Sequence, residues 1–363
     1  MSPEELVTVY SPREDGTRPI DFRGELLHRE LHRCTDPATH DAGERLLFGS
    51  LVVTWLFVTL AVLLAFELYY VRIVLRVFET KPPFGVPFFQ PDPNAEPIEF
   101  TTRDGLTLRG SLHRQPDRIA KGLILFCPET DGSHWSAVSY CHGLIEDGFD
   151  VMSFDFRGQG ESDLLPGYTP NHWPTMYEVE DVRAAIDFIS RREDLQGLPL
   201  GLMGVSRGSM MALIAAAECP SVRAVCCEGA YSTDALTLYF ILHWSSIYLP
   251  PWLRGLIPLW HYKLTMKLVR WTSRFLRQRR YVVLERWLPR LRNRPVLLVT
   301  GERDNYVHSD VARELVRCIQ SSAAQVWTVP RAKHNKARNV AAAEYDRRLT
   351  AFFSQLDAPV TAS

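Results

Sequence analysis

The sequence predicts an α/β fold with a mostly parallel, doubly wound sheet and an antiparallel hairpin at its N-terminal edge. Three observations lead to this class. From residue 121 onward, short apolar segments typical of buried strands alternate with amphipathic segments typical of helices. Two strand-like segments around Asp104-Gly105 come first and indicate a hairpin. One buried strand, 198–205, runs directly into a helix through a serine flanked by glycines.

The composition is that of an ordinary globular protein. The chain has 363 residues, of which 46% are hydrophobic and 23% charged, so a large core is expected and wholesale disorder is not. The net charge of −1 points to no class of partner. The seven cysteines are odd in number and include the adjacent pair Cys226 and Cys227, which favours reduced core thiols, and hence a cytoplasmic domain, over a disulfide framework.

The N-terminal region divides into a polar tail and an apolar helix. Residues 1–45 are polar, with a short helix expected around residues 24–32. Residues 46–66 carry no charge, and a run of about 20 such residues is enough to cross a hydrocarbon core. We therefore expect one transmembrane helix over 46–79, with a buried core helix as the alternative. Arginines on its two sides balance, so they leave the orientation open.

A proline-rich segment follows this helix. Residues 80–96 are expected to form a stiff linker, because their prolines exclude helix and inner strand. The soluble domain is then expected to begin near Pro97. Its core is expected to cover 97–230 and 295–357, interrupted by an insertion at 231–294 and followed by a short tail at 358–363.

The elements of the core follow from hydrophobic periodicity and from turn residues. The hairpin is expected at 98–102 and 106–110. Further strands are expected at 121–127, 149–156, 198–205, 222–228, 295–300 and 325–330. Helices are expected at 136–146, 176–191, 207–217, 309–319 and 339–356.

The junction between the strand 198–205 and the next helix carries the strongest functional signal. The strand ends in the pattern Gly204-x-Ser206-x-Gly208, and a helix-forming run begins at once. This is the pattern of a nucleophile elbow, in which the glycines let strand and helix approach closely while the serine hydroxyl is exposed on a strained turn. A serine in this position predicts nucleophilic catalysis, which requires a base and a carboxylate that orients the base.

Two residues that follow later strands are candidates for these partners. Active groups in parallel sheets gather at the carboxyl ends of the strands. Asp304 and His334 each come shortly after a predicted strand, so both are expected at the edge that carries Ser206. Alternatives remain open: Glu302 or Asp234 for the carboxylate, and His308 for the base.

With this order of serine, aspartate and histidine, residues 97–356 resemble the α/β-hydrolase superfamily. The likeness is to its serine-hydrolase branch, which includes monoacylglycerol lipases and small membrane-bound acyl hydrolases. The elbow, the two strand-end residues and the segment 155–162, DFRGQGES, carry the resemblance. It implies that Ser206 is the nucleophile, His334 the general acid and base, and Asp304 the carboxylate that holds the imidazole tautomer.

An oxyanion hole requires two backbone N–H donors. Arg207, the residue after the nucleophile, is expected to supply one, and the loop after the first strand beyond the hairpin the other. Cys127-Pro128 replaces the family's usual His-Gly in that loop, and proline has no N–H. The second donor is therefore expected to be Glu129 or Thr130. The Glu129 side chain either hydrogen-bonds a substrate amine or hydroxyl, or is a solvated loop carboxylate.

No cofactor or metal is expected. The pattern Gly158-x-Gly160 lacks the third glycine and the following helix of a dinucleotide-binding site. His134, Cys141 and His142 lack the spacing of structural zinc ligands.

The insertion 231–294 is, by the same resemblance, a helical cap over the active site. It is rich in aromatic residues and contains one helix that carries a stripe of basic residues beside a stripe of apolar residues. The helix is expected either to lie on an anionic bilayer or to pack its apolar stripe on the core with its basic stripe in water. Nucleic-acid binding is not expected, because no recognition module accompanies the basic residues. The basic stripe is Lys263, Lys267, Arg270, Arg274 and Arg277, and the apolar stripe is Leu264, Leu268, Trp271 and Phe275.

These features together predict a single-pass membrane protein whose catalytic domain, expected in the cytoplasm, is a serine hydrolase. It is expected to cleave an ester or thioester, in a lipid or an acylated substrate, through an acyl-enzyme on Ser206. The expected partners are the lipid bilayer and this substrate. An aminopeptidase or amidase with the same triad, and a non-catalytic binding protein of the same fold, are the alternatives.

Overall fold

The computed structural model describes residues 37–81, 89–116 and 118–357, with side chains from Phe48 onward. The helix expected around residues 24–32 and the tail 358–363 lie outside the described residues. The chain divides into two units, residues 1–66 and residues 67–363. The second unit contains the sheet, the helices that cover it and the insertion.

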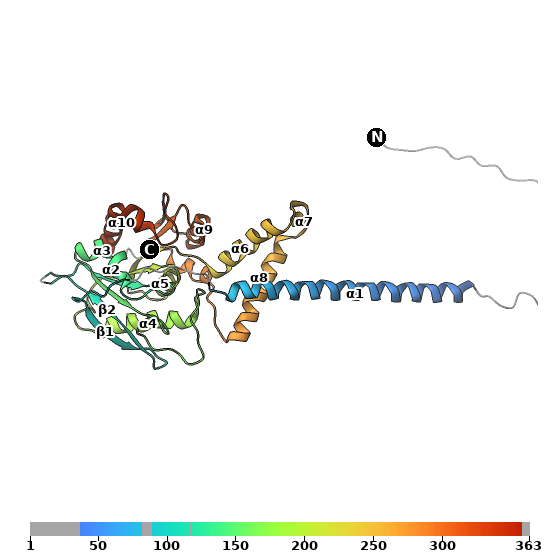
Figure 1. Ribbon diagram of the computed structural model, residues 1–363, viewed down its shortest axis with the longest axis horizontal. Coiled ribbons are helices and arrows are strands. Elements are labelled where there is room, and N and C mark those ends of the chain that lie inside the picture. The colour runs from blue at the N-terminus through green and yellow to red at the C-terminus, as the bar shows by residue number, and fades with distance from the viewer. Residues whose placement is uncertain (1–36, 82–88, 117, 358–363) are drawn as a thin grey trace, which may run out of the picture. The chain divides into compact units, whose positions relative to one another are not determined.

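One mixed sheet forms the centre of the second unit (Figure 1). Its strands, in the described residues, are Glu96–Thr101 (β1), Thr107–His113 (β2), Leu123–Cys127 (β3), Asp150–Phe154 (β4), Leu200–Val205 (β5), Val222–Glu228 (β6), Val296–Gly301 (β7) and Ala324–Val329 (β8). Their order in the sheet is β1-β2-β4-β3-β5-β6-β7-β8. The β1–β2 and β2–β4 pairs are antiparallel, and all other neighbours are parallel. The predicted hairpin and the mostly parallel sheet are both confirmed.

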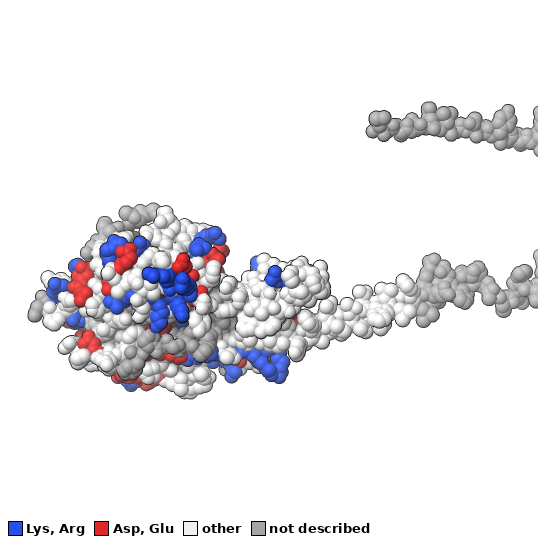
Figure 2. All heavy atoms as spheres, turned by 45° about the horizontal axis from the view of Figure 1, so that its top comes forward, with Lys and Arg blue, Asp and Glu red and all other residues white. Residues whose placement is uncertain are grey.

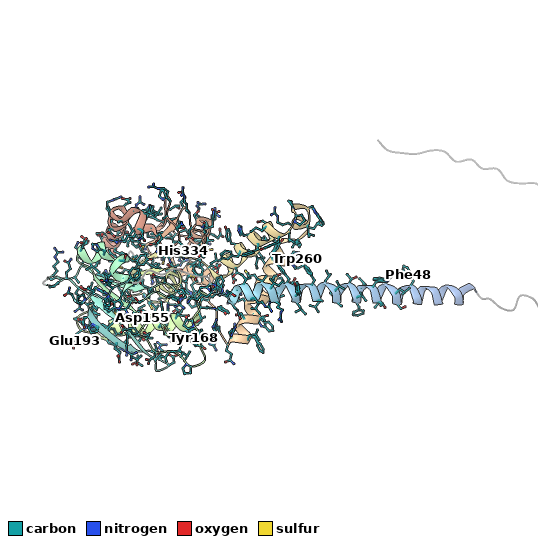
Figure 3. All side chains as sticks on the ribbon, viewed as in Figure 1. Phe48, Asp155, Tyr168, Glu193, Trp260 and His334 are labelled. Carbon is teal, nitrogen blue, oxygen red and sulfur yellow. The ribbon has the colours of Figure 1, made fainter. Side chains whose placement is uncertain are left out.

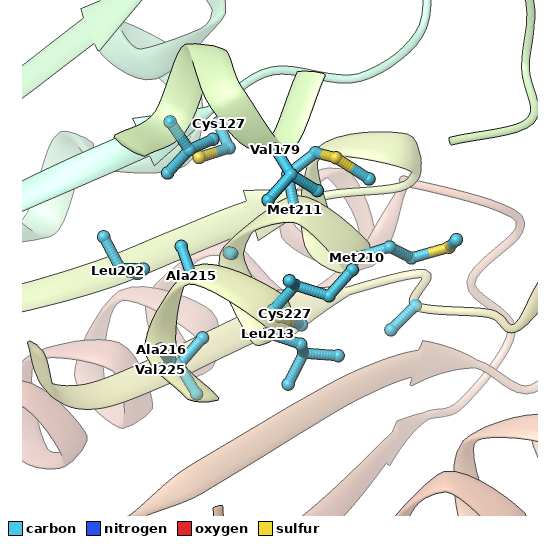
Figure 4. Close-up of a cluster of buried hydrophobic side chains, with 14 of the residues drawn as sticks. Cys127, Val179, Leu202, Met210, Met211, Leu213, Ala215, Ala216, Val225 and Cys227 are labelled. Carbon is cyan, nitrogen blue, oxygen red and sulfur yellow. The ribbon is translucent and has the colours of Figure 1, made fainter. Parts of the chain in front are cut away.

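Helices cover both faces of this sheet. They are α2 (Ser136–Tyr140), α3 (His142–Glu146), α4 (Met176–Arg191), α5 (Arg207–Glu218), α9 (Ser309–Ile319) and α10 (Ala337–Phe353). Successive strand residues point to opposite faces, so Leu202 packs with α4, α5 and α9, whereas Met203 packs with α2, α3 and α10. Figure 4 shows part of the first core, in which Leu202 lies among residues of α5.

Two helices differ from their predicted extents. The segment predicted as one helix at 136–146 is broken at Cys141, whose φ of −105° and ψ of 13° leave the helical range. After the break, Gly143 lets α3 approach α10 closely, because a Cβ on Gly143 would lie 2.6 Å from the Asp346 Cβ. Helix α10 is kinked at Ala341 (φ −139°, ψ 50°) and continues as a 3-10 turn, Ser354–Asp357.

The N-terminal apolar helix is longer than expected. α1 (Pro37–Glu79) has 43 residues and begins at Pro37 rather than at residue 46. Proline is favoured in the first turn of a helix, where an N–H has no intrahelical partner. From Phe48 to Glu79 the helix is long and apolar enough to cross a bilayer. The side chains of its most apolar part are exposed, unlike those of a core helix in a soluble protein.

The C-terminal part of α1, residues 67–79, belongs to the second unit. Val71 and Phe78 are buried in its core, and the Phe78 ring stacks on Trp173 with 4.7 Å between centroids. The indole N–H of Trp173 donates to the Phe78 carbonyl at 2.6 Å. The folded unit therefore begins at Glu67 and not near Pro97. The proline-rich composition of 80–96 gave no sign of this, because the partners that bury α1 are distant in sequence.

The insertion is helical, as expected, but the buried face of its longest helix differs from the predicted one. The insertion, which we call the cap, contains α6 (Thr233–Tyr248), α7 (Pro251–Leu256) and α8 (Leu259–Arg277), followed by 3-10 turns at Leu284–Arg286 and Leu288–Leu291. In α8, Met266 and Val269 are buried, whereas Trp271 and Phe275 are 65% and 74% exposed. Of the predicted apolar stripe, only Leu268 packs against the core. The alternative in which the whole stripe packs there is therefore wrong for Trp271 and Phe275, because α8 packs against α1 and α6 through its other face.

Candidate active site

Ser206 lies at the sharp turn between β5 and α5. Its φ of 51° and ψ of −118° are unusual for a residue with a side chain, and such a backbone conformation costs about 1–3 kcal/mol. Both flanking glycines are required by close backbone contacts. A Cβ on Gly204 would lie 2.6 Å from the Ser209 Cα, and a Cβ on Gly208 would lie 2.1 Å from the Cys127 carbonyl oxygen. The turn therefore has the strained geometry expected of a nucleophile elbow.

Hydrogen bonds to the neighbouring strand hold this turn in place. The backbone N–H of Ser206 donates to the carbonyl oxygen of Glu228, at the end of β6, over 2.8 Å. The Ser209 hydroxyl lies 2.8 Å from the same carbonyl and 2.8 Å from that of Gly204. The strained serine persists because β5, β6 and α5 are all tied to the turn.

His334 lies beyond the end of β8 and reaches Ser206. The Ser206 Oγ is 3.1 Å from the His334 Nε2, which is within hydrogen-bonding distance. Gly229, directly after β6, makes room for the ring, because a Cβ there would lie 2.9 Å from the His334 Cε1. The second unit, residues 67–363, is called the catalytic unit below. Figure 3 shows His334 within this unit, away from Trp260 on the cap.

Asp304 lies after β7 and contacts the other ring nitrogen. The His334 Nδ1 is 2.7 Å from the Asp304 Oδ2. The second carboxylate oxygen, Oδ1, accepts the backbone N–H groups of Tyr306 and Val307, each at 2.8 Å. The carboxylate is buried and its orientation is fixed by these bonds. The structure thus brings Ser206, His334 and Asp304 together in the order of a hydroxyl, a base and an orienting carboxylate.

The alternative carboxylates and base lie elsewhere. Glu302 is exposed and accepts a backbone N–H from the loop after β8. Asp234, in the first turn of α6, forms an ion pair with Arg270 of α8. His308 is the N-cap residue of α9 and is about half exposed. In the described contacts, none of the three takes part in the Ser206–His334–Asp304 arrangement.

The loop after β3 lies against the start of α5. A Cβ on Gly208 would meet the carbonyl oxygens of both Cys127 and Pro128, so the backbones are in close contact there. Arg207 is the first residue of α5, and the first N–H groups of a helix have no intrahelical partner. Glu129 and Thr130 follow directly in the loop and are both buried. These are the residues from which the two oxyanion donors were predicted.

Glu129 is buried, so it is not the solvated carboxylate that was one of its two expected roles. Its Oε2 accepts the hydroxyl of Ser136 at 3.3 Å. Gly132 packs on the carboxyl group, because a Cβ there would lie 2.7 Å from the Glu129 Cδ. Burial raises the pKa of Glu129 to about 7, so its carboxyl group changes charge near neutral pH.

We expect Glu129→Gln to gain stability relative to the wild type as the pH rises from about 5 to about 8. The raised pKa means that folded wild-type protein retains a proton that the unfolded chain releases, so its stability falls as the pH rises through this interval. The relative gain is expected to reach about 2–3 kcal/mol, because each pKa unit corresponds to about 1.4 kcal/mol. Tm measured across this pH range checks the prediction, with Glu161→Gln on an exposed loop as control. A pH-independent difference would contradict it.

Two charged residues beside the elbow, Glu228 and Arg207, are buried and make side-chain contacts that the sequence did not predict. The Glu228 carboxylate accepts the Ala337 N–H at 2.9 Å and the Tyr345 hydroxyl at 2.7 Å, which ties β6 to α10. Burial raises the pKa of Glu228. The Arg207 side chain is also buried and contacts Glu178 at 3.2 Å. In the sequence, the one sign of a buried charge was that Glu228 directly ends an apolar strand.

The segment 155–162 forms a turn around a buried carboxylate. Asp155 accepts the backbone N–H groups of His134 at 2.6 Å and Glu161 at 2.9 Å. The His134 Nδ1 lies 3.0 Å from the same carboxylate. A Cβ on Gly160 would lie 2.0 Å from Asp155 Oδ2, so the glycine is needed for the turn. This accounts for the pattern Gly158-x-Gly160 without a dinucleotide.

The model of the alpha/beta hydrolase family matches residues 124–347, more than half of the chain. The chain belongs to this family. The fold predicted from the elbow and the alternating strands and helices is thereby confirmed. Family membership also supports hydrolase activity in general.

Curated relatives of this α/β-hydrolase are uncharacterized proteins. YfhR from Escherichia coli O157:H7 is 30% identical over 156 residues, which are 40% of this chain and 51% of YfhR. PA2218 from Pseudomonas aeruginosa is 30% identical over 138 residues, which are 37% of this chain and 36% of PA2218. The chain spans about half or less of the length of these relatives.

Solved structures share the hydrolase fold at low sequence identity. The Pyrococcus furiosus esterase Pf2001 aligns with a TM-score of 0.54 at 18% identity, covering 76% of this chain and 97% of the esterase. PA2218 aligns with a TM-score of 0.53 at 18% identity, covering 75% and 99%. Est1E from Butyrivibrio proteoclasticus, with bound ferulic acid, aligns with a TM-score of 0.52 at 15% identity, covering 72% and 100%.

Proposed function

We propose that this α/β-hydrolase is a membrane-anchored serine hydrolase that cleaves an ester or thioester through an acyl-enzyme on Ser206. The observation that carries the proposal is the pair of contacts on the strained elbow, 3.1 Å from the Ser206 Oγ to the His334 Nε2 and 2.7 Å from the His334 Nδ1 to the Asp304 Oδ2. The esterases that share the fold support an ester as the substrate class.

In the acylation step, the Ser206 Oγ attacks the carbonyl carbon of the substrate while the His334 Nε2 takes the hydroxyl proton. Asp304 accepts the Nδ1–H of His334, which leaves Nε2 free to act as a base and stabilises the imidazolium that forms. The bond from the carbonyl carbon to the leaving oxygen or sulfur then breaks. His334 returns the proton to the leaving group, which departs as an alcohol or thiol.

In the deacylation step, a water molecule attacks the acyl group on Ser206 with His334 again as the base. The carboxylic acid departs and the serine regains its proton. In both steps the carbonyl oxygen becomes negatively charged, and backbone N–H groups stabilise that charge. We assign these donors to Arg207 and to Glu129 or Thr130, because the loop after β3 lies against the start of α5.

Membrane anchoring is supported by the exposed apolar helix from Phe48 to Glu79. A cytoplasmic catalytic unit is supported by the buried free thiols Cys226 and Cys227. A hydrolase held at a bilayer meets esters and thioesters of membrane lipids or of acylated proteins. We therefore propose that its substrate is of this kind.

Labelling with a fluorophosphonate probe tests the proposed nucleophile. We expect full-length protein in detergent to be labelled, Ser206→Ala to lose the label, and His334→Ala to lose it nearly completely, because the serine is then without its base. Ser246→Ala, on an exposed position of the cap, is the matched control and should label like the wild type. Folded wild-type protein that takes no label would refute the catalytic proposal.

A substrate panel separates the proposed activity from its alternative. Wild type and Ser206→Ala are assayed with an ester, a thioester and an aminoacyl amide. We expect the ester or thioester to be cleaved by the wild type alone. Cleavage of the amide alone would instead support an aminopeptidase or amidase with the same three residues.

A further inference from the structure

The cap leaves a set of large apolar side chains in contact with solvent. Each of these side chains is at least 42% exposed, and we call the set the cap face: Trp244, Ile247, Tyr248, Trp252, Leu256, Leu259, Trp260, Leu264, Trp271, Phe275 and Leu276. In Figure 2 the surface over α6 and α7 is almost entirely white, whereas the surface over the core shows both blue and red.

Exposed apolar residues are scarce on the remainder of the catalytic unit. Among the described residues outside α1 and the cap, the exposed large hydrophobic side chains are Ile119, Leu164 and Val340, which come from three separate segments. Soluble monomers seldom expose a contiguous apolar patch larger than a few hundred Å², and larger patches mark sites of interaction. Because the exposed apolar side chains of this part of the chain gather on the cap, the cap face is the candidate docking surface.

The opposite face of α8 already has a partner within the chain. Near one end of the contact, Glu67 of α1 accepts the Thr265 hydroxyl at 2.8 Å. Near the other end, Glu79 accepts the Ser273 hydroxyl at 2.9 Å and pairs with Arg277 at 2.9 Å. Because α8 is held against α1 at Thr265 and at Ser273, Tyr262 is buried while Trp260, Trp271 and Phe275 stay exposed.

The link in sequence between the apolar helix and the residues that hold the cap favours a lipid bilayer as the occupant of the cap face. The uncharged stretch of α1 ends at Phe66, and the next residue, Glu67, contacts α8. In the catalytic unit α1 itself adds exposed apolar residues such as Tyr69 and Ile73. The residues that directly follow the uncharged stretch are thus packed against the cap. Tryptophan and tyrosine, which prefer the boundary between lipid and water, make up five members of the cap face, including Trp260.

The charge of the cap suits anionic lipid headgroups. The sequences of α7 and α8 contain basic residues and no aspartate or glutamate. Lys263, Lys267 and Arg274 are exposed, whereas Arg270 and Arg277 of the same predicted stripe are paired with carboxylates of the chain. Exposed basic residues close to a membrane are attracted to anionic lipid headgroups.

We propose that the cap face inserts into the interfacial layer of the bilayer, with the exposed basic residues of α8 against anionic headgroups. Helices that bind in this way bury their apolar side chains about 5–10 Å below the headgroup boundary. The cap is then a second membrane contact beside α1. This inference rests on the membrane anchoring in the proposed function, but it does not depend on catalysis by Ser206.

Photocrosslinking in full-length protein tests the docking surface without any need for activity. The photoreactive residue p-benzoylphenylalanine replaces Trp252, Trp260 or Phe275, and the protein is reconstituted in phosphatidylcholine vesicles that contain phosphatidylserine. We expect lipid adducts at all three positions. The same replacement at Leu164 or Val340, which are exposed on the core, is the matched control and should give none above background.

A second comparison tests the contribution of charge. Combined Lys263→Gln, Lys267→Gln and Arg274→Gln substitutions should lower the adduct yield at Trp260 several-fold in vesicles with phosphatidylserine and leave it unchanged in phosphatidylcholine alone. Cap positions that crosslink no more lipid than the core controls, or that crosslink mainly to a second copy of the chain, would overturn the proposal. If labelling of Ser206 fails while the lipid adducts form, the docking surface stands and the catalytic proposal falls.

Discussion

Asp304→Asn is expected to lower kcat about 10³–10⁴-fold with little change in Tm. The asparagine Oδ1 retains the acceptor for the N–H groups of Tyr306 and Val307, so the loop keeps its shape. The amide nitrogen that replaces Oδ2 is a donor and cannot accept the Nδ1–H of His334. The imidazole then loses the tautomer that places a base at Nε2, and the imidazolium loses its counter-charge.

Glu302→Gln is the matched control for this substitution. Glu302 lies two residues from Asp304 in the same loop, but it is exposed and hydrogen-bonds a backbone N–H away from the site. We expect its kcat to stay within a factor of about two of the wild type, as for surface substitutions in general. The measurement is steady-state kinetics on whichever ester or thioester the panel identifies. Equal kinetics for wild type and Asp304→Asn would remove Asp304 from the triad.

Gly208→Ala is expected to destabilise the fold by about 3 kcal/mol, the upper end of the usual range for overpacked sites. The added Cβ would lie 2.1 Å from the Cys127 carbonyl oxygen and 2.5 Å from that of Pro128. Both contacts are with backbone, which cannot rotate away as a side chain can. The loop after β3 must therefore shift, and the proposed oxyanion donors shift with it. Thermal unfolding and fluorophosphonate labelling measure the two effects.

Gly255→Ala separates this contact from a general effect of replacing glycine. Gly255 lies in α7, and a Cβ there meets nothing within 4 Å. Alanine at such a helical position is expected to stabilise the protein by about 0.5–1 kcal/mol, because it restricts the unfolded chain. If the two variants had similar Tm values, the close approach of the loop after β3 to α5 would not be the cause of any destabilisation by Gly208→Ala.

Elements with strong local signals were predicted closely from the sequence. The helix predicted at 176–191 has those bounds in the structure, and Thr175 and Glu178 at its start form a capping box. The strand before Ser206 is buried on both faces and therefore appears as a continuous apolar run. The positions of Asp304 and His334 near Ser206 were predictable for a related reason, since the ends of parallel strands meet at one edge of the sheet.

Features that depend on distant partners were not predictable in the same way. The buried face of α8 is chosen by α1, whose Glu67 contacts Thr265 across almost two hundred positions of the chain. Both candidate faces of α8 carry apolar residues, so the periodicity alone does not select one. The burial of Glu129 likewise results from the packing of Ser136 and Gly132 around its carboxyl group, which no local pattern reports.

The burial of Phe78 changes what the proline-rich segment does in the protein. Because residues 67–79 are part of the second unit, residues 80–95 connect two segments of that unit and do not separate it from α1. A domain on a flexible tether samples many heights above a membrane. In the proposed membrane-anchored protein, the helix that enters the bilayer is itself part of the fold through residues 67–79.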